Sequence, residues 1–276
     1  MKKIRLVANT VVCNEECWVW YALKSVLPYI DEILVWDTGS SDATVFIINS
    51  IRSQKIKFRS VNPTSNETAL SLTRQEMLLK TRANWLMILD GDEVWPEQSL
   101  KTILKFIALR GDKFDSIVVP SLNCVGDIYH ISPPESGKYK IAGKTGHYNL
   151  RFINLDRIKG LHVENPPGHL QSYYDSKNIK VQDRNPENIA FLNAPYLHMT
   201  HLTRSRKRKD ETSIFWRGAK KRHELGMRLP KNFVYPQVFN IPRPEVIPSP
   251  WVKRSLYFCI KSSLLEPLRQ LKRFLM

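Results

Sequence analysis

The 276-residue sequence has no uninterrupted apolar run near the roughly 20 residues that a membrane-spanning helix needs. Its first residues lead into a short strand-like segment rather than into the apolar core of a signal peptide. The 4 cysteines form neither a C-x-x-C pair nor the regular spacing of a disulfide framework, so we interpret them as free thiols. These absences predict a cytoplasmic protein without structural disulfides.

The short motifs that identify several large enzyme classes are absent as well. The sequence contains no G-x-G-x-x-G, no G-x-x-x-x-G-K-[ST], no G-x-S-x-G and no H-E-x-x-H. This removes the strongest sequence arguments for dinucleotide oxidoreductases, P-loop enzymes, serine hydrolases and zinc proteases. No internal repeat is visible either.

The net charge of +16 is unevenly distributed along the chain. Residues 204–231 carry 11 Lys and Arg against 3 acidic residues, and residues 232–276 carry 7 against 2. The nearly neutral first part predicts a catalytic or binding core, and the basic part predicts a segment that meets nucleic acid or acidic phospholipid. The run 204–209 resembles a nucleic-acid arm, although such runs are usually solvated surface.

Short β-branched runs alternate with helical patterns through the first 122 residues, which predicts an α/β domain with a largely parallel sheet. We expect strands over 4–13, 32–37, 55–61, 85–90 and 115–122, and helices over 18–27, 43–52, 67–82 and 97–109. Asp42 suits the N-cap of the second helix.

The later sequence is less regular. Glycine and proline between 126 and 146 predict a long loop, followed by short strands over 148–154 and 161–163. The 6 prolines of residues 230–250 favour an extended linker over a packed element. Residues 251–276 form an amphipathic pattern.

Acidic clusters follow the first, second and fourth expected strands, where the ligand crevice of a parallel α/β sheet lies. The sharpest cluster is Asp90-Gly91-Asp92, because two carboxylates separated by one small residue can share a divalent cation that also binds a diphosphate. An isolated D-x-D is more often an ordinary acidic turn. Here an apolar strand directly precedes the D-x-D motif and acidic clusters end two other strands, and both features favour a metal-binding role.

With these motifs the chain resembles the family 2 glycosyltransferases of the GT-A fold over about residues 4–205. The resemblance rests on Val12-Cys13-Asn14-Glu15-Glu16, on Asp37-Thr38-Gly39-Ser40-Ser41-Asp42-Ala43-Thr44, on Arg74, and on Leu89-Asp90-Gly91-Asp92-Glu93. Within the family the chain looks most like the bacterial branch that includes lipopolysaccharide-core glucosyltransferases. That branch carries an Arg-Phe strand and a Gly-x-x-His-Glu element, matched here by Leu150-Arg151-Phe152-Ile153 and by Gly160-Leu161-His162-Val163-Glu164, in which Val163 separates the His and the Glu.

The resemblance implies a GT-A nucleotide-sugar-binding domain over 1–205, a basic and Pro-rich extension over 206–250, and an amphipathic segment over 251–276. It implies an inverting transfer of a sugar from a nucleotide-diphosphate sugar, UDP-linked by our expectation, to a hydroxyl of a glycan or lipid-linked acceptor. The metal would be Mn²⁺ or Mg²⁺. A nucleotidyltransferase is the competing enzyme class, and a basic nucleic-acid-binding protein is the non-enzyme alternative.

The resemblance also assigns residues to the donor. Val12, Glu15 and Asp37 would hold the nucleotide base and ribose. The alternative for Asp37 is a cap of the Thr-Gly-Ser turn. Arg74 would offer a guanidinium to the diphosphate, with a solvated helix face as the alternative.

Asp92 is expected to bind the metal directly, with Asp90 holding ribose or a metal-bound water. A late histidine joins the metal in many GT-A enzymes, and His201, with His198 as its neighbour in the same motif, is the expected ligand. An imidazole would favour Mn²⁺.

The general base must come from the acceptor side, and Glu164 is the first candidate, ahead of Asp127 and Asp175. His162 and His169 are weaker candidates for acceptor contact.

The last segment carries Leu256, Ile260 and Leu264 at helical spacing, followed by Leu268, Leu271 and Leu275, with basic residues interspersed. This pattern predicts a basic amphipathic segment docked on an anionic membrane, on its cytoplasmic face. The alternative is a helix packed on the catalytic domain or in a dimer interface.

Overall fold

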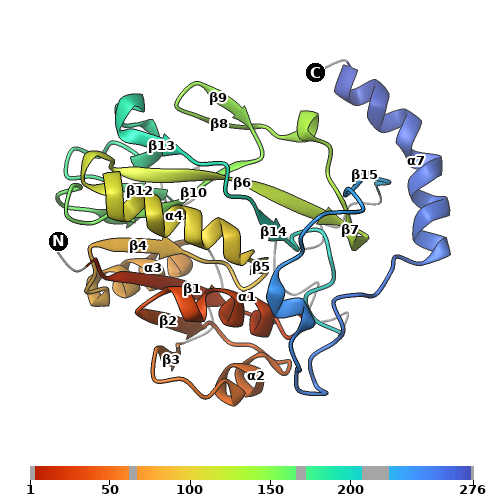
Figure 1. Ribbon diagram of the computed structural model, residues 1–276, viewed down its shortest axis with the longest axis horizontal. Coiled ribbons are helices and arrows are strands. Elements are labelled where there is room, and N and C mark those ends of the chain that lie inside the picture. The colour runs from red at the N-terminus through yellow and green to blue at the C-terminus, as the bar shows by residue number, and fades with distance from the viewer. Residues whose placement is uncertain (1–3, 62–66, 166–171, 207–223, 275–276) are drawn as a thin grey trace.

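The computed structural model describes residues 4–61, 67–165, 172–206 and 224–274 (Figure 1). One large twisted sheet runs through this part of the chain, in the order β15-β7-β6-β10-β4-β1-β2-β3. Its central parallel strands are β1 (Leu6–Val12), β2 (Glu32–Asp37), β3 (Ile56–Ser60) and β4 (Trp85–Ile88). The prediction of an α/β fold with a mostly parallel central sheet is confirmed.

Helices cover both faces of the parallel strands because alternate residues of each strand point to opposite faces. Leu6 and Ala8 of β1 pack in the main core with α1 (Val19–Val26), α2 (Thr44–Ser50) and α4 (Glu97–Arg110). Val7 instead packs with Met77 of α3 (Glu67–Lys80) on the other face. The predicted helices are confirmed, but α2 begins at Thr44 with Ala43 and not Asp42 as its N-cap residue. Asp42 Oδ1 still accepts a hydrogen bond from the Thr44 backbone N–H (2.9 Å).

The second half of the sheet is built around β6 (Ser116–Val125) and β10 (Tyr148–Asn154), which is antiparallel to both β4 and β6. The β10–β6 register shifts between Leu150 and Phe152, so Arg151 is the extra residue of a β-bulge. Three shorter strands complete this half: β5 (Glu93–Val94), β13 (Ile189–Phe191) and β14 (Tyr196–His198). The strands β11 (His162–Glu164) and β12 (Ser172–Tyr174) form a separate two-stranded sheet.

The prediction of a long loop over 126–146 is wrong. This stretch contains β7 (Asp127–Ile131), which pairs with β6, and a hairpin of β8 (Tyr139–Ile141) and β9 (Lys144–Gly146). Apart from Gly146, which ends β9, its glycines and prolines fall in the turns between these strands, which is why the composition resembled that of a loop.

The prediction of an extended linker over 230–250 is also wrong, because this stretch packs on the domain. Val238, Phe239 and Ile247 are buried in the main core. The Tyr21 hydroxyl of α1 donates a hydrogen bond to the Pro248 carbonyl (2.8 Å), and Phe239 packs edge-on against the Tyr21 ring. A short strand, β15 (Met227–Arg228), joins the sheet beside β7.

The chain ends in α7 (Leu256–Phe274), which lies along one side of the molecule (Figure 1). Ser255 Oγ accepts a hydrogen bond from the Phe258 N–H (3.1 Å), and the Arg254 N–H donates to Asp127 Oδ2 (3.1 Å). The outer side of the helix is apolar: Leu256, Tyr257, Ile260 and Leu264 are exposed. No helix in the described ranges is long and apolar enough to span a membrane.

Candidate active site

Three loops meet at the carboxyl ends of β1, β2 and β4. Asn14 ties the first two together: its N–H donates to Ser40 Oγ (2.8 Å), and its Oδ1 accepts from the Ser41 N–H (2.7 Å). Asn14 has a φ of 51°, a left-handed conformation that asparagine adopts more readily than most residues. The loops are therefore held in a fixed arrangement by their own polar groups.

Asp37 ends β2 and is 3% exposed. Its Oδ2 accepts hydrogen bonds from the backbone N–H groups of Gly39 and Ser40, both at 3.1 Å. It therefore caps the turn, and its predicted contact with a nucleotide stays a prediction.

Gly91 brings the predicted nucleotide residues against the predicted metal motif. A Cβ atom at Gly91 would lie 3.0 Å from Glu15 Cγ and 3.1 Å from Val12 Cγ1. Both neighbours are buried, so only a residue without a side chain fits easily between Asp90 and Asp92.

Asp90 lies between two arginines from different elements. Its Oδ1 is 3.3 Å from Arg74 Nη2 of α3, and its Oδ2 is 3.0 Å from Arg151 Nη2 of β10. Burial alone would raise the pKa of Asp90, but Arg151 and Arg74 outweigh it and lower the pKa to about 2. Asp90 is thus an anion at neutral pH. Its ion pair with Arg74 holds the Arg74 guanidinium in the site, where the predicted contact with a diphosphate requires it.

Glu93 is fully buried and forms an ion pair with Arg151. Burial raises the pKa of Glu93 to about 7 against the opposing effect of Arg151. Arg151 is further held by Tyr196, whose hydroxyl accepts from Arg151 Nε (3.2 Å). A single guanidinium therefore links two carboxyl groups of the motif.

Asp92 is 1% exposed and faces a different set of cations. Its Oδ2 lies 3.3 Å from Arg204 Nε and 3.4 Å from His198 Nε2. Arg204 Nη1 also lies 2.9 Å from Glu15 Oε1, and Asp92 and Glu15 hold the pKa of this guanidinium above its ordinary value. Arg204 thus connects the β1 loop with the acidic motif.

Asp90, Glu93 and His198 offer two carboxylate oxygens and one ring nitrogen that lie within 4.8 Å of one another. Glu93 Oε2 is buried and has no hydrogen-bond partner among the described residues. Oxygen donors with one imidazole suit Mn²⁺ better than Mg²⁺, so the residues fit a divalent metal. Of the predicted ligands, Asp90 belongs to this group. Asp92 lies next to the group, because its Oδ2 is 3.4 Å from His198 Nε2.

The predicted ligand His201 is placed elsewhere. It lines a second cavity of about 370 Å³, whose wall includes Trp18, Asp127 and Phe258 of α7. The structure therefore brings His198, the neighbour in the same motif, to the acidic cluster.

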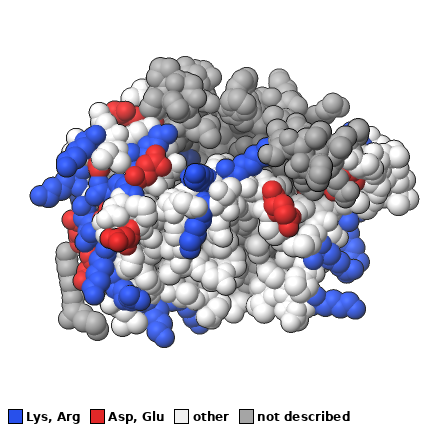
Figure 2. Space-filling model, turned by 90° about the horizontal axis from the view of Figure 1, so that it is seen from above, with Lys and Arg blue, Asp and Glu red and all other residues white. Residues whose placement is uncertain are grey.

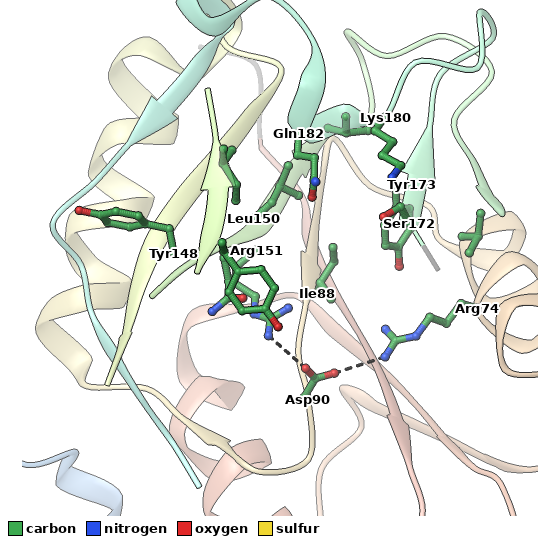
Figure 3. Close-up of a pocket in the computed structure, with 15 residues that line it drawn as sticks. Arg74, Ile88, Asp90, Tyr148, Leu150, Arg151, Ser172, Tyr173, Lys180 and Gln182 are labelled. Atoms are coloured by element: carbon green, nitrogen blue, oxygen red, sulfur yellow. Dashed lines mark hydrogen bonds and ion pairs between the residues drawn. The ribbon is translucent and has the colours of Figure 1, made fainter. Parts of the chain in front are cut away.

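A cavity of about 450 Å³ opens beside Asp90, between β10 and β12 (Figure 3). Its charged lining residues are Arg74, Asp90, Arg151 and Lys180. Tyrosines from three strands line it as well: Tyr139, Tyr148 and Tyr173. A cavity of this size accommodates a small ligand such as a sugar.

The candidate bases lie outside this cavity's lining. Val163 of β11 lines it, whereas Glu164 follows Val163 and pairs with His162 Nε2 at 3.2 Å. Asp127 is buried and pairs with His130 Nδ1 (2.7 Å). Asp175 is buried and pairs with Arg184. His169 lies outside the described residues.

Sequence reasoning assigned no role to Arg151, Glu93 or Arg204. Arg151 and Glu93 stood inside quoted motifs, so their residue types were visible. Their partners were not, because Arg151 and Asp90 are 61 positions apart and Arg204 and Glu15 are 189 apart.

The profile described as Glycosyl transferase family 2 matches residues 10–178. No curated protein sequence matches the chain. Solved structures are similar only distantly. S. aureus TarS 1-349 has 15% identity and a TM-score of 0.47, over 71% of this chain and 61% of that one. The Mycobacterium tuberculosis glucosyl-3-phosphoglycerate synthase in complex with Mn²⁺ and uridine-diphosphate-glucose has 17% identity and a TM-score of 0.45, over 80% of this chain and 76% of that one.

The chain thus spans about three fifths of the TarS 1-349 chain. Similarities at these sequence identities and TM-scores do not identify a substrate of the present protein.

Proposed function

The chain belongs to glycosyl transferase family 2, and we propose from this membership and from the site that it transfers a sugar from a nucleotide-diphosphate sugar, UDP-linked, to a hydroxyl group with inversion at the anomeric carbon. The observation that carries the proposal is the group of Asp90, Glu93 and His198 at the carboxyl ends of the parallel strands, of which Asp90 also lines a cavity large enough for a sugar.

In this proposal Val12, Glu15 and Asp37 contact the nucleotide base and ribose. All three lie at the ends of β1 and β2, on the side of Asp90 away from β10. Arg74 is placed to contact the diphosphate, because its guanidinium already reaches the site from α3.

Mn²⁺ or Mg²⁺ would be held by Asp90 and Asp92 with a late histidine, and it would supply positive charge that stabilises the leaving nucleoside diphosphate. His198 and Glu93 are the further donors that the geometry offers, and His201 remains the alternative histidine.

The chemical step moves one proton and exchanges one bond. Glu164 accepts the proton of the acceptor hydroxyl, whose oxygen bonds to the anomeric carbon from the face opposite the diphosphate. The bond from that carbon to the diphosphate oxygen breaks, and the nucleoside diphosphate leaves with the electron pair.

We also propose the finer assignments. The chain would belong to the branch of lipopolysaccharide-core glucosyltransferases, a cell-envelope role supported by Arg151-Phe152 and by the element that ends at Glu164. It would consist of a catalytic unit over 1–205, an extension over 206–250 and a C-terminal segment over 251–276. Most of the basic stretch of the extension, 207–223, lies outside the described residues.

The C-terminal segment would dock on the cytoplasmic face of an anionic membrane, where a lipid-linked acceptor is presented. Two observations support docking: the exposed Leu256, Ile260 and Leu264 of α7, and the nearby Lys253 and Lys261. On the face in Figure 2 the basic side chains are most numerous at the left, with acidic side chains among them. The side chains of Leu268 and Leu271 and all of Leu275 lie outside the described residues.

Isothermal titration with UDP, with and without Mn²⁺, tests the function. Metal-dependent binding of UDP is the expected result. Binding of RNA without metal and with a steep salt dependence would instead identify the nucleic-acid-binding alternative. Incorporation of a nucleoside monophosphate from UTP into product would identify a nucleotidyltransferase.

A further inference from the structure

The charges around the 450 Å³ cavity are not balanced. Asp90 is the only acidic residue among its described lining residues, and Arg74 and Arg151 already pair with it. Lys180 is a third cation on the same wall. The cavity therefore has an excess of positive charge, and in the view of Figure 3 Lys180 stands at the end opposite Asp90.

The backbone of Lys180 is fixed. It forms a β-bridge with Tyr174, and its carbonyl accepts a hydrogen bond from the Asp183 N–H (2.9 Å). The side chain is half-buried, and within the described ranges no carboxylate forms an ion pair with it. A half-buried ammonium group without a counter-charge favours the binding of an anion.

The groups around Lys180 are neutral and suit a sugar. Ser172, Tyr173 and Gln182 surround it in Figure 3 and offer hydroxyl and amide groups. Tyr139 of β8 and Tyr148 of β10 also line the cavity and provide apolar area with a polar tip.

The donor nucleotide does not account for this cation. The residues proposed to bind its base and ribose lie at the ends of β1 and β2, and β4 separates these strands from β10. Arg74, proposed for its diphosphate, lines the cavity at the end near Asp90. Lys180 belongs to the opposite flank, where the cavity is walled by β10 and β12.

We propose that the acceptor is an anionic sugar, with its phosphate or carboxylate group on Lys180 and its sugar ring between Lys180 and Asp90. The proposal rests on the glycosyltransferase function above and adds the chemical class of the acceptor. Lys180 is then a specificity-determining residue that selects acceptors by charge.

The test measures acceptor binding separately from donor binding. The protein is saturated with UDP and Mn²⁺ and titrated with glucose 6-phosphate, glucuronate or glucose, so that phosphate, carboxylate and neutral probes are compared. Lys180→Gln removes the charge and Lys180→Arg keeps it. Lys177→Gln is the matched control, because Lys177 is an exposed lysine of the same segment that does not line this cavity.

We expect an anionic sugar to bind the wild type at least about tenfold more tightly than glucose, because a hydrogen bond to a charged group carries that much affinity. Lys180→Gln should lose this preference, whereas Lys180→Arg and Lys177→Gln should keep it. UDP affinity should be equal in all variants.

Two results would overturn the proposal. Glucose binding as tightly as both anionic sugars would remove the charge preference. An equal loss of UDP affinity in Lys180→Gln would place Lys180 in the donor site. A wild type that fails to bind UDP would contradict the proposed function itself, and that failure is seen before any acceptor is added.

Discussion

Arg151 Nη2 lies 3.0 Å from Asp90 Oδ2, so a guanidinium from the antiparallel strand β10 pairs with the first carboxylate of the acidic motif. Arg151 is buried and bonds to Glu93 and Tyr196 as well. The arginine therefore fixes the direction in which two carboxyl groups of the motif point.

Arg151→Lys should lower kcat by about 10²-fold, because a lysine keeps the charge but cannot bond to Asp90, Glu93 and Tyr196 at once. Arg151→Gln should lower it further. Steady-state kinetics with a Mn²⁺ titration measure both effects, and Arg110→Lys on α4 is a surface control. Wild-type turnover in a folded Arg151→Gln protein would show that the guanidinium is dispensable.

Asp92→Ala should reduce the rate by about 10³-fold or more, the loss expected when a ligand that neutralises a leaving diphosphate is removed. Because Asp92 is buried beside Arg204 and His198, Asp92→Asn is the milder variant for a protein that must stay folded. Circular dichroism establishes folding before the rate is compared. Near-native turnover would exclude Asp92 as a metal ligand.

Glu164→Gln should slow transfer while metal-dependent UDP binding is unchanged, since a general base acts on the acceptor and not on the nucleotide. Equal losses of rate and UDP affinity would instead make Glu164 a binding or structural residue.

The parallel half of the sheet was predictable because its signal is local. β1, β2 and β4 are short apolar runs that end at acidic turns, and the helices between them show their own periodicity. The strand β7 lies near one edge of the large sheet, and β8 and β9 form a two-stranded sheet of their own. They were missed because half-exposed residues and nearby glycines weaken the apolar pattern there.

The packing of residues 230–250 was missed for a related reason. Tyr235 and Phe239 pack through ring contacts with Trp251, at 5.2 Å and 5.8 Å between centroids, and these contacts need no regular spacing along the chain. In the site, residue types were predictable wherever they followed a strand. The choice between His198 and His201 was not, because it depends on how β14 pairs with β5 beside the motif.

Asp175→Asn should destabilise the fold without lowering kcat. Asp175 is buried, pairs with Arg184 and accepts the N–H of Lys177 (2.9 Å) and of Ile179 (3.0 Å). Losing one of these charged interactions costs about 1–3 kcal/mol of unfolding free energy. Urea titrations at pH 7 measure this loss.

The unfolding free energy of Asp175→Asn should also depend less steeply on pH at acidic pH than that of the wild type. Burial raises the pKa of Asp175, but the two N–H groups and Arg184 outweigh it, so the net pKa is lowered from 3.8. A lowered carboxyl pKa stabilises the fold fully above pH 3.8, and this stabilisation is lost as the pH falls below that value toward the folded pKa. The wild type should lose stability more steeply than Asp175→Asn in that window. If the unfolding free energies of the two proteins fell in parallel with pH, groups other than Asp175 would cause the loss of stability in acid.

Leu256→Ser, Ile260→Ser and Leu264→Ser together should weaken binding to vesicles of anionic lipid by about tenfold or more, because each removes an apolar side chain from the outer side of α7. Leu109→Ser, another exposed leucine, is the control and should bind normally. Co-sedimentation at two salt concentrations measures both. Unchanged binding of the triple variant would favour α7 as a packed or oligomeric helix.

Because Arg151 lies in a β-bulge, its position depends on the exact number of residues in β10. Loss of one codon between those of Tyr148 and Phe152 would restore regular pairing with β6, and it would either delete Arg151 or move it from the bulge to the position opposite Val118. Substitutions at these positions change one side chain each, but a single-residue deletion would remove the guanidinium from two carboxyl groups at once. We therefore expect libraries of this gene to tolerate point changes in β10 far better than insertions or deletions.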